Sequence, residues 1–211
     1  MNLNVYTLPV GELDTNCHIL YSDNNDKALI IDPGGDFFEI EGKLKALNKS
    51  AGAVILTHCH YDHIGALNGF EKMGVPVYIG KNEVKNLNSP VNLANWFGVE
   101  FKSKSAVNEL IEGDIQICGF NLSIIFTPGH TNGSICIIAG QYMLTGDTLF
   151  CGSYGRTDFP TGSEEQLIKS AKKILSLDKN YILLTGHGDN TTLFNERKNN
   201  YINFLITDKL W

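Results

Sequence analysis

The six residues HCHYDH, at positions 58–63, determine how the rest of this chain is interpreted. They place three imidazoles and a carboxylate directly after the run 53–56, whose short, apolar and partly β-branched composition predicts a buried strand. A carboxylate in such surroundings is costly unless its charge is compensated, and a bound cation supplies that compensation. The pattern therefore predicts a metal site on the loop that follows this strand.

Three more apolar runs lead into a small residue or glycine and then into a side chain that can bind a metal. These runs begin at residues 123, 142 and 181, and they lead to His130, Asp147 and His187. If the predicted sheets stack, the ends of these strands converge on one edge and bring the side chains together. The candidate metal ligands are His58, His60, Asp62, His63, His130, Asp147 and His187.

The types of residue in this set indicate which metals it would bind. Five of the six histidines of the chain belong to it, and His18, the remaining one, is expected to be a hydrogen-bonded structural residue. Cys59 lies between two candidate ligands, but the alternation of side chains is expected to point it away from them. Nitrogen and carboxylate donors without thiolates suit zinc, iron or manganese, and imidazole favours zinc or iron. The set is too large for one tetrahedral ion. We therefore expect two divalent ions, zinc before iron or manganese, about 3.5–4 Å apart with a water between them.

Composition and charge argue against several classes of protein. With 211 residues, 43% of them hydrophobic, the chain is long enough to bury a substantial core. The net charge of −6 argues against a nucleic-acid partner, and no apolar run is long enough to span a membrane. The five cysteines are scattered without a C-x-x-C pair, and the first residues do not have the form of a signal peptide. A cytoplasmic protein is expected, and its oligomeric state is not indicated.

Short apolar runs and turn residues predict strands that are separated by helices. The strands are expected at residues 4–8, 17–22, 28–31, 53–56, 75–79, 114–118, 122–126, 134–138, 142–144 and 181–184. Helical spacing predicts helices at 37–48 and 66–73, a third that begins after a capping box at 163–166, and a closing helix over 194–207. This order predicts an α/β sandwich with helices outside two sheets.

The ligand pattern H-x-H-x-D-H, followed by a lone His, an Asp and a second lone His, resembles that of the metallo-β-lactamase-fold hydrolases. Residues 13–17, 31–34, 146–150, 155–160 and 186–196 are also similar to the small bacterial glyoxalase II-like branch of that family. The resemblance implies a four-layer αβ/βα sandwich, with two mixed sheets flanked by helices, in a single domain over residues 1–211.

The resemblance also implies a role for each candidate ligand. The ligands implied for one metal ion are His58, His60 and His130, and those implied for a second are Asp62, His63 and His187. Asp147 would bridge the two ions, and Asp62 would also accept a proton from the attacking water, so these two carboxylates are the implied catalytic residues. The implied activity is hydrolysis of a small hydroxyacyl thioester by a hydroxide that bridges the metals.

Two departures from the longer glyoxalase II enzymes concern the substrate. Those enzymes add a C-terminal helical domain that grips glutathione, and no room for it is expected before Trp211. They also carry Gly-Lys-Phe-Tyr-like residues, with Lys and Tyr near the thiol, where this chain has residues 155–158. Arg156 and Asp158 are therefore the candidate substrate-binding residues: Arg156 could meet a substrate carboxylate, or the two could pair and fix the loop.

Two interpretations of other segments stay open. Asp32 begins the turn sequence Asp-Pro-Gly, and it is either a turn residue or an acceptor that orients a ligand loop. The pair Trp96-Phe97 is either a flap over the site or part of the surface packing.

The main alternative activity on the same fold is that of an iron-dependent persulfide dioxygenase. Its single iron would use His58, His130 and Asp147, and it shares the His-Cys-His and Gly-Arg-Thr-Asp-Phe strings. The Ile-Gly-Ala that follows His63 and the Gly-His-Gly around His187 are more similar to the hydrolase branch. These two segments favour hydrolysis of a thioester.

Overall fold

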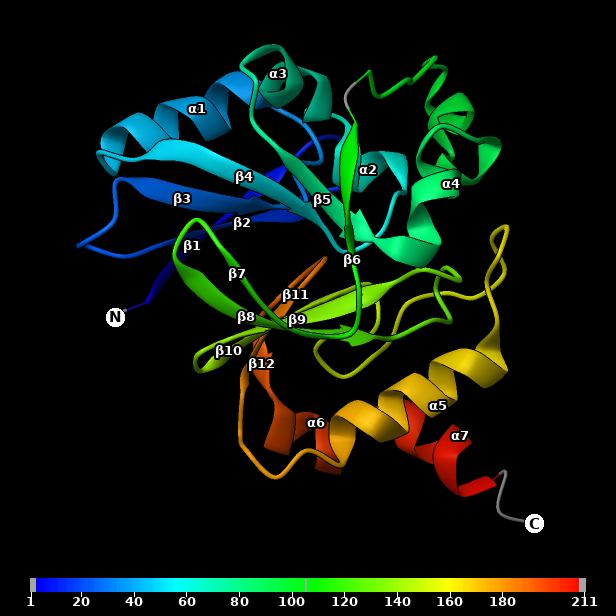
Figure 1. Ribbon diagram of the computed structural model, residues 1–211. Coiled ribbons are helices and arrows are strands. Elements are labelled where there is room, and N and C mark those ends of the chain that lie inside the picture. The colour runs from blue at the N-terminus through cyan, green and yellow to red at the C-terminus, as the bar shows by residue number, and fades with distance from the viewer. Residues whose placement is uncertain (1–2, 105, 209–211) are drawn as a thin grey trace.

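A computed structural model describes residues 3–104 and 106–208, and in it two six-stranded sheets stack against each other (Figure 1). The first sheet has the strand order β1 (Asn4–Val10), β2 (Thr15–Tyr21), β3 (Lys27–Ile31), β4 (Ser50–Leu56), β5 (Val77–Gly80) and β6 (Val107–Leu110). The second has the order β12 (Thr191–Thr192), β11 (Ile182–Thr185), β10 (Tyr142–Gly146), β9 (Ile135–Ala139), β8 (Phe120–Phe126) and β7 (Gly113–Ile117). Both sheets are mixed, because β3 to β6 run parallel in the first and β10 runs parallel to β11 in the second.

Helices cover the outer face of each sheet. The helices over the first sheet are α1 (Phe37–Ala46) and α3 (Leu67–Lys72), and those over the second are α5 (Glu164–Leu175), α6 (Leu193–Asn199) and α7 (Ile202–Asp208) (Figure 1). The shorter helices are α2 (Tyr61–Ile64), η1 (Lys81–Glu83), α4 (Val84–Leu87), η2 (Pro90–Asn92) and η3 (Ala94–Phe97). This four-layer arrangement confirms the predicted fold class. Within the described part of the chain, no helix has the length and apolar composition that crossing a bilayer needs.

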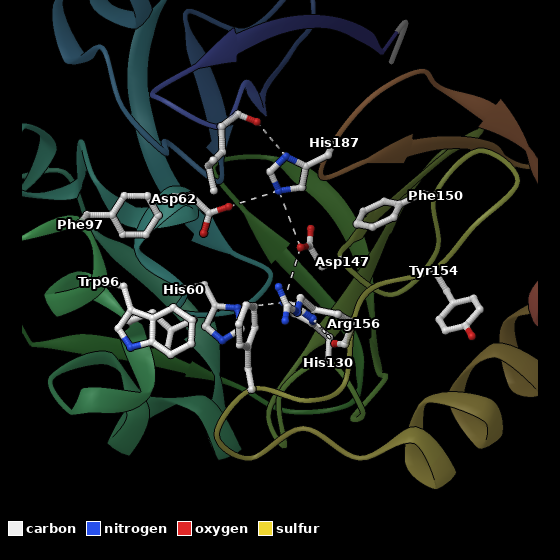
Figure 2. Close-up of a pocket in the computed structure, with 13 residues that line it drawn as sticks. His60, Asp62, Trp96, Phe97, His130, Asp147, Phe150, Tyr154, Arg156 and His187 are labelled. Carbon is white, nitrogen blue, oxygen red and sulfur yellow. Dashed lines mark hydrogen bonds and ion pairs between the residues drawn. The ribbon is translucent and has the colours of Figure 1, made fainter.

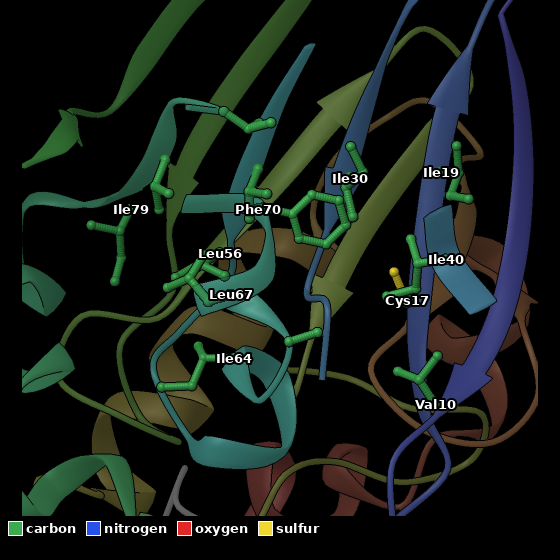
Figure 3. Close-up of a cluster of buried hydrophobic side chains, with 14 of the residues drawn as sticks. Val10, Cys17, Ile19, Ile30, Ile40, Leu56, Ile64, Leu67, Phe70 and Ile79 are labelled. Atoms are coloured by element: carbon green, nitrogen blue, oxygen red, sulfur yellow. The ribbon is translucent and has the colours of Figure 1, made fainter. Parts of the chain in front are cut away.

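After their first residues, Lys27 and Ser50, strands β3 and β4 are apolar and do not alternate with polar residues, because most of each strand is buried on both faces. In β4, Ala53 and Ile55 pack into the core between the two sheets. Leu56, on the opposite face, packs with Leu67 and Phe70 in the core under the helices (Figure 3). Burial of each large apolar side chain contributes about 1.5–3 kcal/mol, so these strands are firmly held and their ends are fixed in position.

The helix predicted after the capping box is confirmed. α5 begins after Ser163, whose Oγ accepts a hydrogen bond from the backbone N–H of Gln166 at 3.3 Å. Such a cap typically stabilises a helix by about 1 kcal/mol. One face of α5, which includes Leu167, Ala171 and Ile174, is buried against the second sheet.

The C-terminal region differs from the sequence prediction. The single closing helix predicted over 194–207 is wrong, because the backbone of Asn200 is extended, with ψ 136°, and divides the segment into α6 and α7. The Asn200 side chain donates to the carbonyl oxygens of Phe150 and Ser153 at 3.1 and 2.8 Å. The break therefore ties these helices to the loop after β10.

Candidate metal centre

The ends of strands β4, β8, β10 and β11 converge at one edge of the sandwich, and they bring the predicted ligands together. His58 and His60 follow β4, and α2, which carries Asp62 and His63, comes directly after them. The three side chains that come from the second sheet are His130, Asp147 and His187. Figure 2 shows them next to His60 and Asp62, around one cavity.

Three of the histidines form a first group. One ligand atom from each of His58, His60 and His130 lies within 4.8 Å of the others, and all three residues are buried. His60 Nδ1 and His130 Nε2 face each other at 2.8 Å. Burial lowers the pKa of His60 to about 3 and holds that of His58 well below its usual value. These two imidazoles are therefore neutral, which is the form that binds a metal.

Asp62, His63 and His187 form a second group with the same spacing. The Oδ2 atom of Asp62 lies 3.2 Å from His187 Nε2 and 3.6 Å from His63 Nε2. Burial lowers the pKa of His63, but Asp147, Asp62 and Asp32 outweigh it and hold that pKa well above its usual value. A cluster of carboxylates around this imidazole therefore creates a demand for positive charge, which a divalent cation would meet.

Asp147 lies between the two groups. Its Oδ1 is 3.3 Å from His63 Nε2, and its Oδ2 is 3.5 Å from His130 Nε2 and 3.7 Å from His187 Nε2. Burial raises the pKa of Asp147, but the neighbouring histidines outweigh burial and hold it well below its usual range. Asp147 is thus ionised, with one oxygen toward the second group and the other between the two groups.

Hydrogen bonds orient four of the histidines so that Nε2 faces the cluster. The Nδ1 atoms of four of them have partners outside the cluster: Thr57 Oγ1 for His58 at 3.1 Å, Asp32 Oδ2 for His63 at 3.0 Å, the Arg156 carbonyl for His130 at 2.7 Å and the Leu13 carbonyl for His187 at 3.2 Å. A proton held on Nδ1 leaves the lone pair on Nε2, which is the nitrogen that faces the cluster.

Unpaired polar atoms give a direct test of whether these residues fit metal ions. Within residues 3–104 and 106–208, the buried side-chain atoms without a hydrogen-bond partner include His58 Nε2, His60 Nε2, His63 Nε2 and Asp147 Oδ1. Buried polar atoms are almost always paired, so such a concentration at one place needs an explanation. Two divalent ions held by these residues would account for it, and the nitrogen and oxygen donor set suits zinc, iron or manganese.

Asp32 has the geometry of an acceptor that orients the ligand loop. Its carboxylate accepts from the backbone N–H of Thr57 at 2.7 Å, from the Thr57 hydroxyl at 2.6 Å and from His63 Nδ1 at 3.0 Å. The Thr57 hydroxyl also contacts His58 Nδ1. Asp32 also lies in a group with His58 and His63. Its contact with His63 is to Nδ1, the nitrogen on the far side of the ring from Asp147, so we interpret Asp32 as a support for the ligands.

The sequence analysis missed Glu83, a fully buried carboxylate in η1. It accepts hydrogen bonds from the backbone N–H of Cys59 at 3.1 Å and from the Thr131 hydroxyl at 3.0 Å. Glu83 therefore ties together the two loops that carry the first histidine group. A signal was available, because Glu83 follows an apolar strand as the predicted ligands do, and β5 is the neighbour of β4 in the first sheet.

Replacing Glu83 with Ala is expected to weaken metal binding about 10- to 100-fold, as loss of a group that orients metal ligands typically does. The Cys59 N–H would be left buried without an acceptor. Titration of zinc against a chromogenic chelator measures the affinity. The control is Glu39→Ala, which removes an exposed glutamate of α1. Equal affinities of the two variants would show that Glu83 does not support the site.

The cavity above the ligands has a volume of about 580 Å³ and largely apolar walls. Trp96 and Phe97, for which two interpretations were open, line it together with Phe159, Phe150, Tyr154 and Leu13.

Arg156 also lines the cavity, and its Nε and Nη2 donate to the two oxygens of Asp158 at 2.7 and 2.6 Å. The hydrogen bonds from Arg156 lower the pKa of Asp158 to about 2. The two candidate substrate-binding residues therefore pair with each other.

His18 is hydrogen-bonded, as predicted. Its Nδ1 lies 3.0 Å from the Thr7 hydroxyl, and its Nε2 lies 3.1 Å from the carbonyl oxygen of Thr185. Burial lowers its pKa to about 4. This residue lies outside both groups of candidate ligands and supports the packing of β2 against the strand that leads to His187.

Because the pKa of His18 is depressed, the unfolded chain binds the proton more tightly than the folded one. The stability that His18 contributes is complete above pH 6.5 and is lost as the pH falls from 6.5 to about 4. Over this range the free energy of unfolding of the wild type should fall more steeply than that of His18→Gln, by up to about 1.4 kcal/mol per pH unit. Urea unfolding at equal metal loading measures both slopes. Parallel slopes would contradict the depressed pKa.

The amino-acid sequence matches the model of one known protein family. The model of the metallo-beta-lactamase superfamily matches residues 10–187, and this chain belongs to that superfamily. The family resemblance noted in the sequence is confirmed.

Individual relatives narrow the comparison. The chain is 39% identical to a Bacillus subtilis protein named probable metallo-hydrolase YqgX, over 92% of this chain and 94% of that protein. It is 36% identical to the hydroxyacylglutathione hydrolase GloC of Haemophilus influenzae, over 94% of this chain and 97% of that protein.

Solved structures give the same result for the fold. The BLEG-1 B3 metallo-beta-lactamase matches with a TM-score of 0.88 at 32% identity, covering 97% of this chain and 100% of its own. The protein TTHA1623, in a di-iron-bound form, matches with a TM-score of 0.84 at 29% identity, covering 93% and 99%.

Proposed function

We propose that this protein is a dinuclear metal-dependent hydrolase that cleaves a small hydroxyacyl thioester. The observation that carries the proposal is the pair of ligand groups with Asp147 between them, open to one cavity. The Haemophilus influenzae relative, named as a hydroxyacylglutathione hydrolase, supports the choice of a thioester. His58, His60 and His130 would hold one ion, and Asp62, His63 and His187 the other.

Bound metal ions would polarise the thioester carbonyl and lower the pKa of a water at the site. The residues of the chain would orient that water and accept its proton. Asp62 lines the cavity, and its Oδ2 accepts a hydrogen bond from the Thr15 hydroxyl at 3.3 Å. Burial raises the pKa of Asp62, but His63 and the hydrogen bond with His187 outweigh it and keep this pKa low. Asp62 is therefore ionised at neutral pH and available as a proton acceptor. A thiolate leaves readily, so no strong acid is needed on its side.

The second ligand group favours hydrolysis over persulfide oxidation. A single iron bound by His58, His130 and Asp147 would leave the group of Asp62, His63 and His187 without a role. The Nε2 of His63 has no hydrogen-bond partner and faces the carboxylates of Asp62 and Asp147, which supports a second metal in the same way.

Thiol release from S-lactoylglutathione by the metal-loaded full chain tests the proposal. We expect release by the wild type and a rate lower by about 10²-fold or more in His63→Ala, since loss of one ligand removes several kcal/mol of metal stabilisation. Release at an equal rate in His63→Ala would contradict the proposal. Oxygen uptake on a thiol persulfide with one iron per chain would instead support the dioxygenase.

A further inference from the structure

Aromatic rings border the ligand cluster on two sides of the cavity. The Phe159 ring lies 5.5 Å from that of His60 in an edge-to-face arrangement, and Trp96 packs edge to face on Phe159 at 5.3 Å. The Phe150 ring lies 6.0 Å from His187. In Figure 2, Trp96 and Phe97 lie on one side of the ligands, and Phe150 and Tyr154 lie on the other. If the reactive carbonyl of a substrate lies at the ligand cluster, the parts of the substrate on either side of that carbonyl would each contact an apolar wall.

These walls include apolar side chains that the protein leaves in contact with solvent. Trp96 is 69% exposed and Leu13 is 51% exposed, and both line the cavity. An apolar ligand group placed in the cavity would remove this surface from water, which is the main source of affinity in largely apolar pockets. The cavity is thus suited to a ligand that carries an aromatic or bulky aliphatic group.

The charges of the cavity do not suit an anionic carrier. Among the lining residues that the structure describes, Arg156 is the only Lys or Arg. Its guanidinium already donates to both oxygens of Asp158 and lies over the Phe159 ring at 4.0 Å. Glutathione carries two carboxylates and one ammonium group. Among the side chains that line the cavity, its carboxylates would find one cation, and that cation is already paired.

We propose that the site prefers thioesters of an apolar thiol, with an aromatic or bulky aliphatic group, over thioesters of glutathione. The inference rests on the proposed thioesterase function and specifies the class of its substrate. The aromatic wall of Trp96 and Phe159 contacts the carrier group, and the metal ligands act on the carbonyl. Cleavage adds water across the thioester bond: the C–S bond breaks, and the acyl carbon takes the water oxygen and leaves as a carboxylate. One proton of the water goes to the departing thiolate, and the other is released to the solvent.

The test compares two substrates with the same acyl group on the metal-loaded full chain. They are the lactoyl thioester of benzyl mercaptan and S-lactoylglutathione. Both release an alkyl thiolate, so a difference in kcat/KM reports recognition of the carrier. We expect kcat/KM for the benzyl thioester to be higher by about tenfold or more, an effect typical of one well-placed apolar group.

Variants at exposed aromatic positions make the test specific. Trp96→Ala should lower kcat/KM for the benzyl thioester, mainly through KM, and should reduce the preference between the two substrates. The matched control is Phe38→Ala on α1, which removes an aromatic side chain that is 81% exposed and outside the cavity. This variant should retain the wild-type preference.

The possible failures can be told apart. A preference for S-lactoylglutathione, or an equal effect of Trp96→Ala on both substrates, would overturn the inference and leave thioester hydrolysis standing. Failure to cleave either thioester, with both metal ions bound, would overturn the proposed function and the inference together.

Discussion

Replacing Asp147 with Asn is expected to lower turnover by about 10³-fold or more while the fold is retained. Asn has nearly the same shape, but it removes the charge that lies between the two ligand groups. Asp147 Oδ1 faces His63 at 3.3 Å and Oδ2 faces His130 at 3.5 Å, so a neutral amide would weaken the hold on both ions. Thiol release at saturating metal, together with metal analysis of the same sample, measures the effect.

The same chemical change at an exposed position provides the control. Asp23→Asn alters an aspartate in the turn between β2 and β3, on the surface and outside the candidate site. It should keep wild-type turnover and metal content. If Asp147→Asn retained turnover within a fewfold of Asp23→Asn, the carboxylate would not be the bridge between two ions.

Gly186→Ala is expected to lower turnover by about 10²-fold or more, because small misplacements of catalytic groups have effects of that size. A Cβ at this position would lie 2.2 Å from Asp147 Oδ1 and 3.0 Å from His63 Cε1. One added methyl group would therefore push Asp147, the residue shared by the two groups, out of place. Overpacking of this kind typically also reduces the free energy of unfolding by about 1–3 kcal/mol.

Gly42→Ala is the matched control for this variant. Gly42 lies within α1, and a Cβ added there would have no neighbour within 4 Å. Alanine in the interior of a helix should raise stability by about 0.5–1 kcal/mol, and turnover should not change. Steady-state thiol release and urea unfolding of both variants measure the two effects. Wild-type turnover in Gly186→Ala would contradict the close approach of Gly186 to Asp147.

The fold and the ligand cluster were predictable because both depend on local patterns. From Gly52 to Leu56, strand β4 is buried on both faces and carries no polar side chain, so the polar residues that follow it were expected at its end. The strands that lead to Asp147 and His187 also have buried apolar residues before the ligand, Met143 and Leu144 in β10 and Leu183 and Leu184 in β11. Once these strands stack, their ends meet, so the periodicity of the sequence and the residue types were sufficient to gather the candidate ligands.

Features that depend on contacts between distant segments were not predictable. Glu83 follows an apolar strand, which was a signal for its position, but no local pattern indicates its contacts with the His-Cys-His loop and Thr131. The aromatic walls bring Trp96 and Phe159 together across 63 residues of sequence. The break between α6 and α7 depends on hydrogen bonds from Asn200 to the loop after β10. In each case tertiary hydrogen bonds or ring contacts, and not local propensity, determine the structure.

The number of metal ions per chain tests the central claim most directly. Equilibrium dialysis of the full chain against zinc, followed by metal analysis, should give about two ions per chain in the wild type, as expected for a two-metal site. His63→Ala should bind fewer, because His63 belongs to the second ligand group and contacts Asp147. One ion or none in the wild type, or two ions retained in His63→Ala, would contradict a dinuclear centre built from these residues.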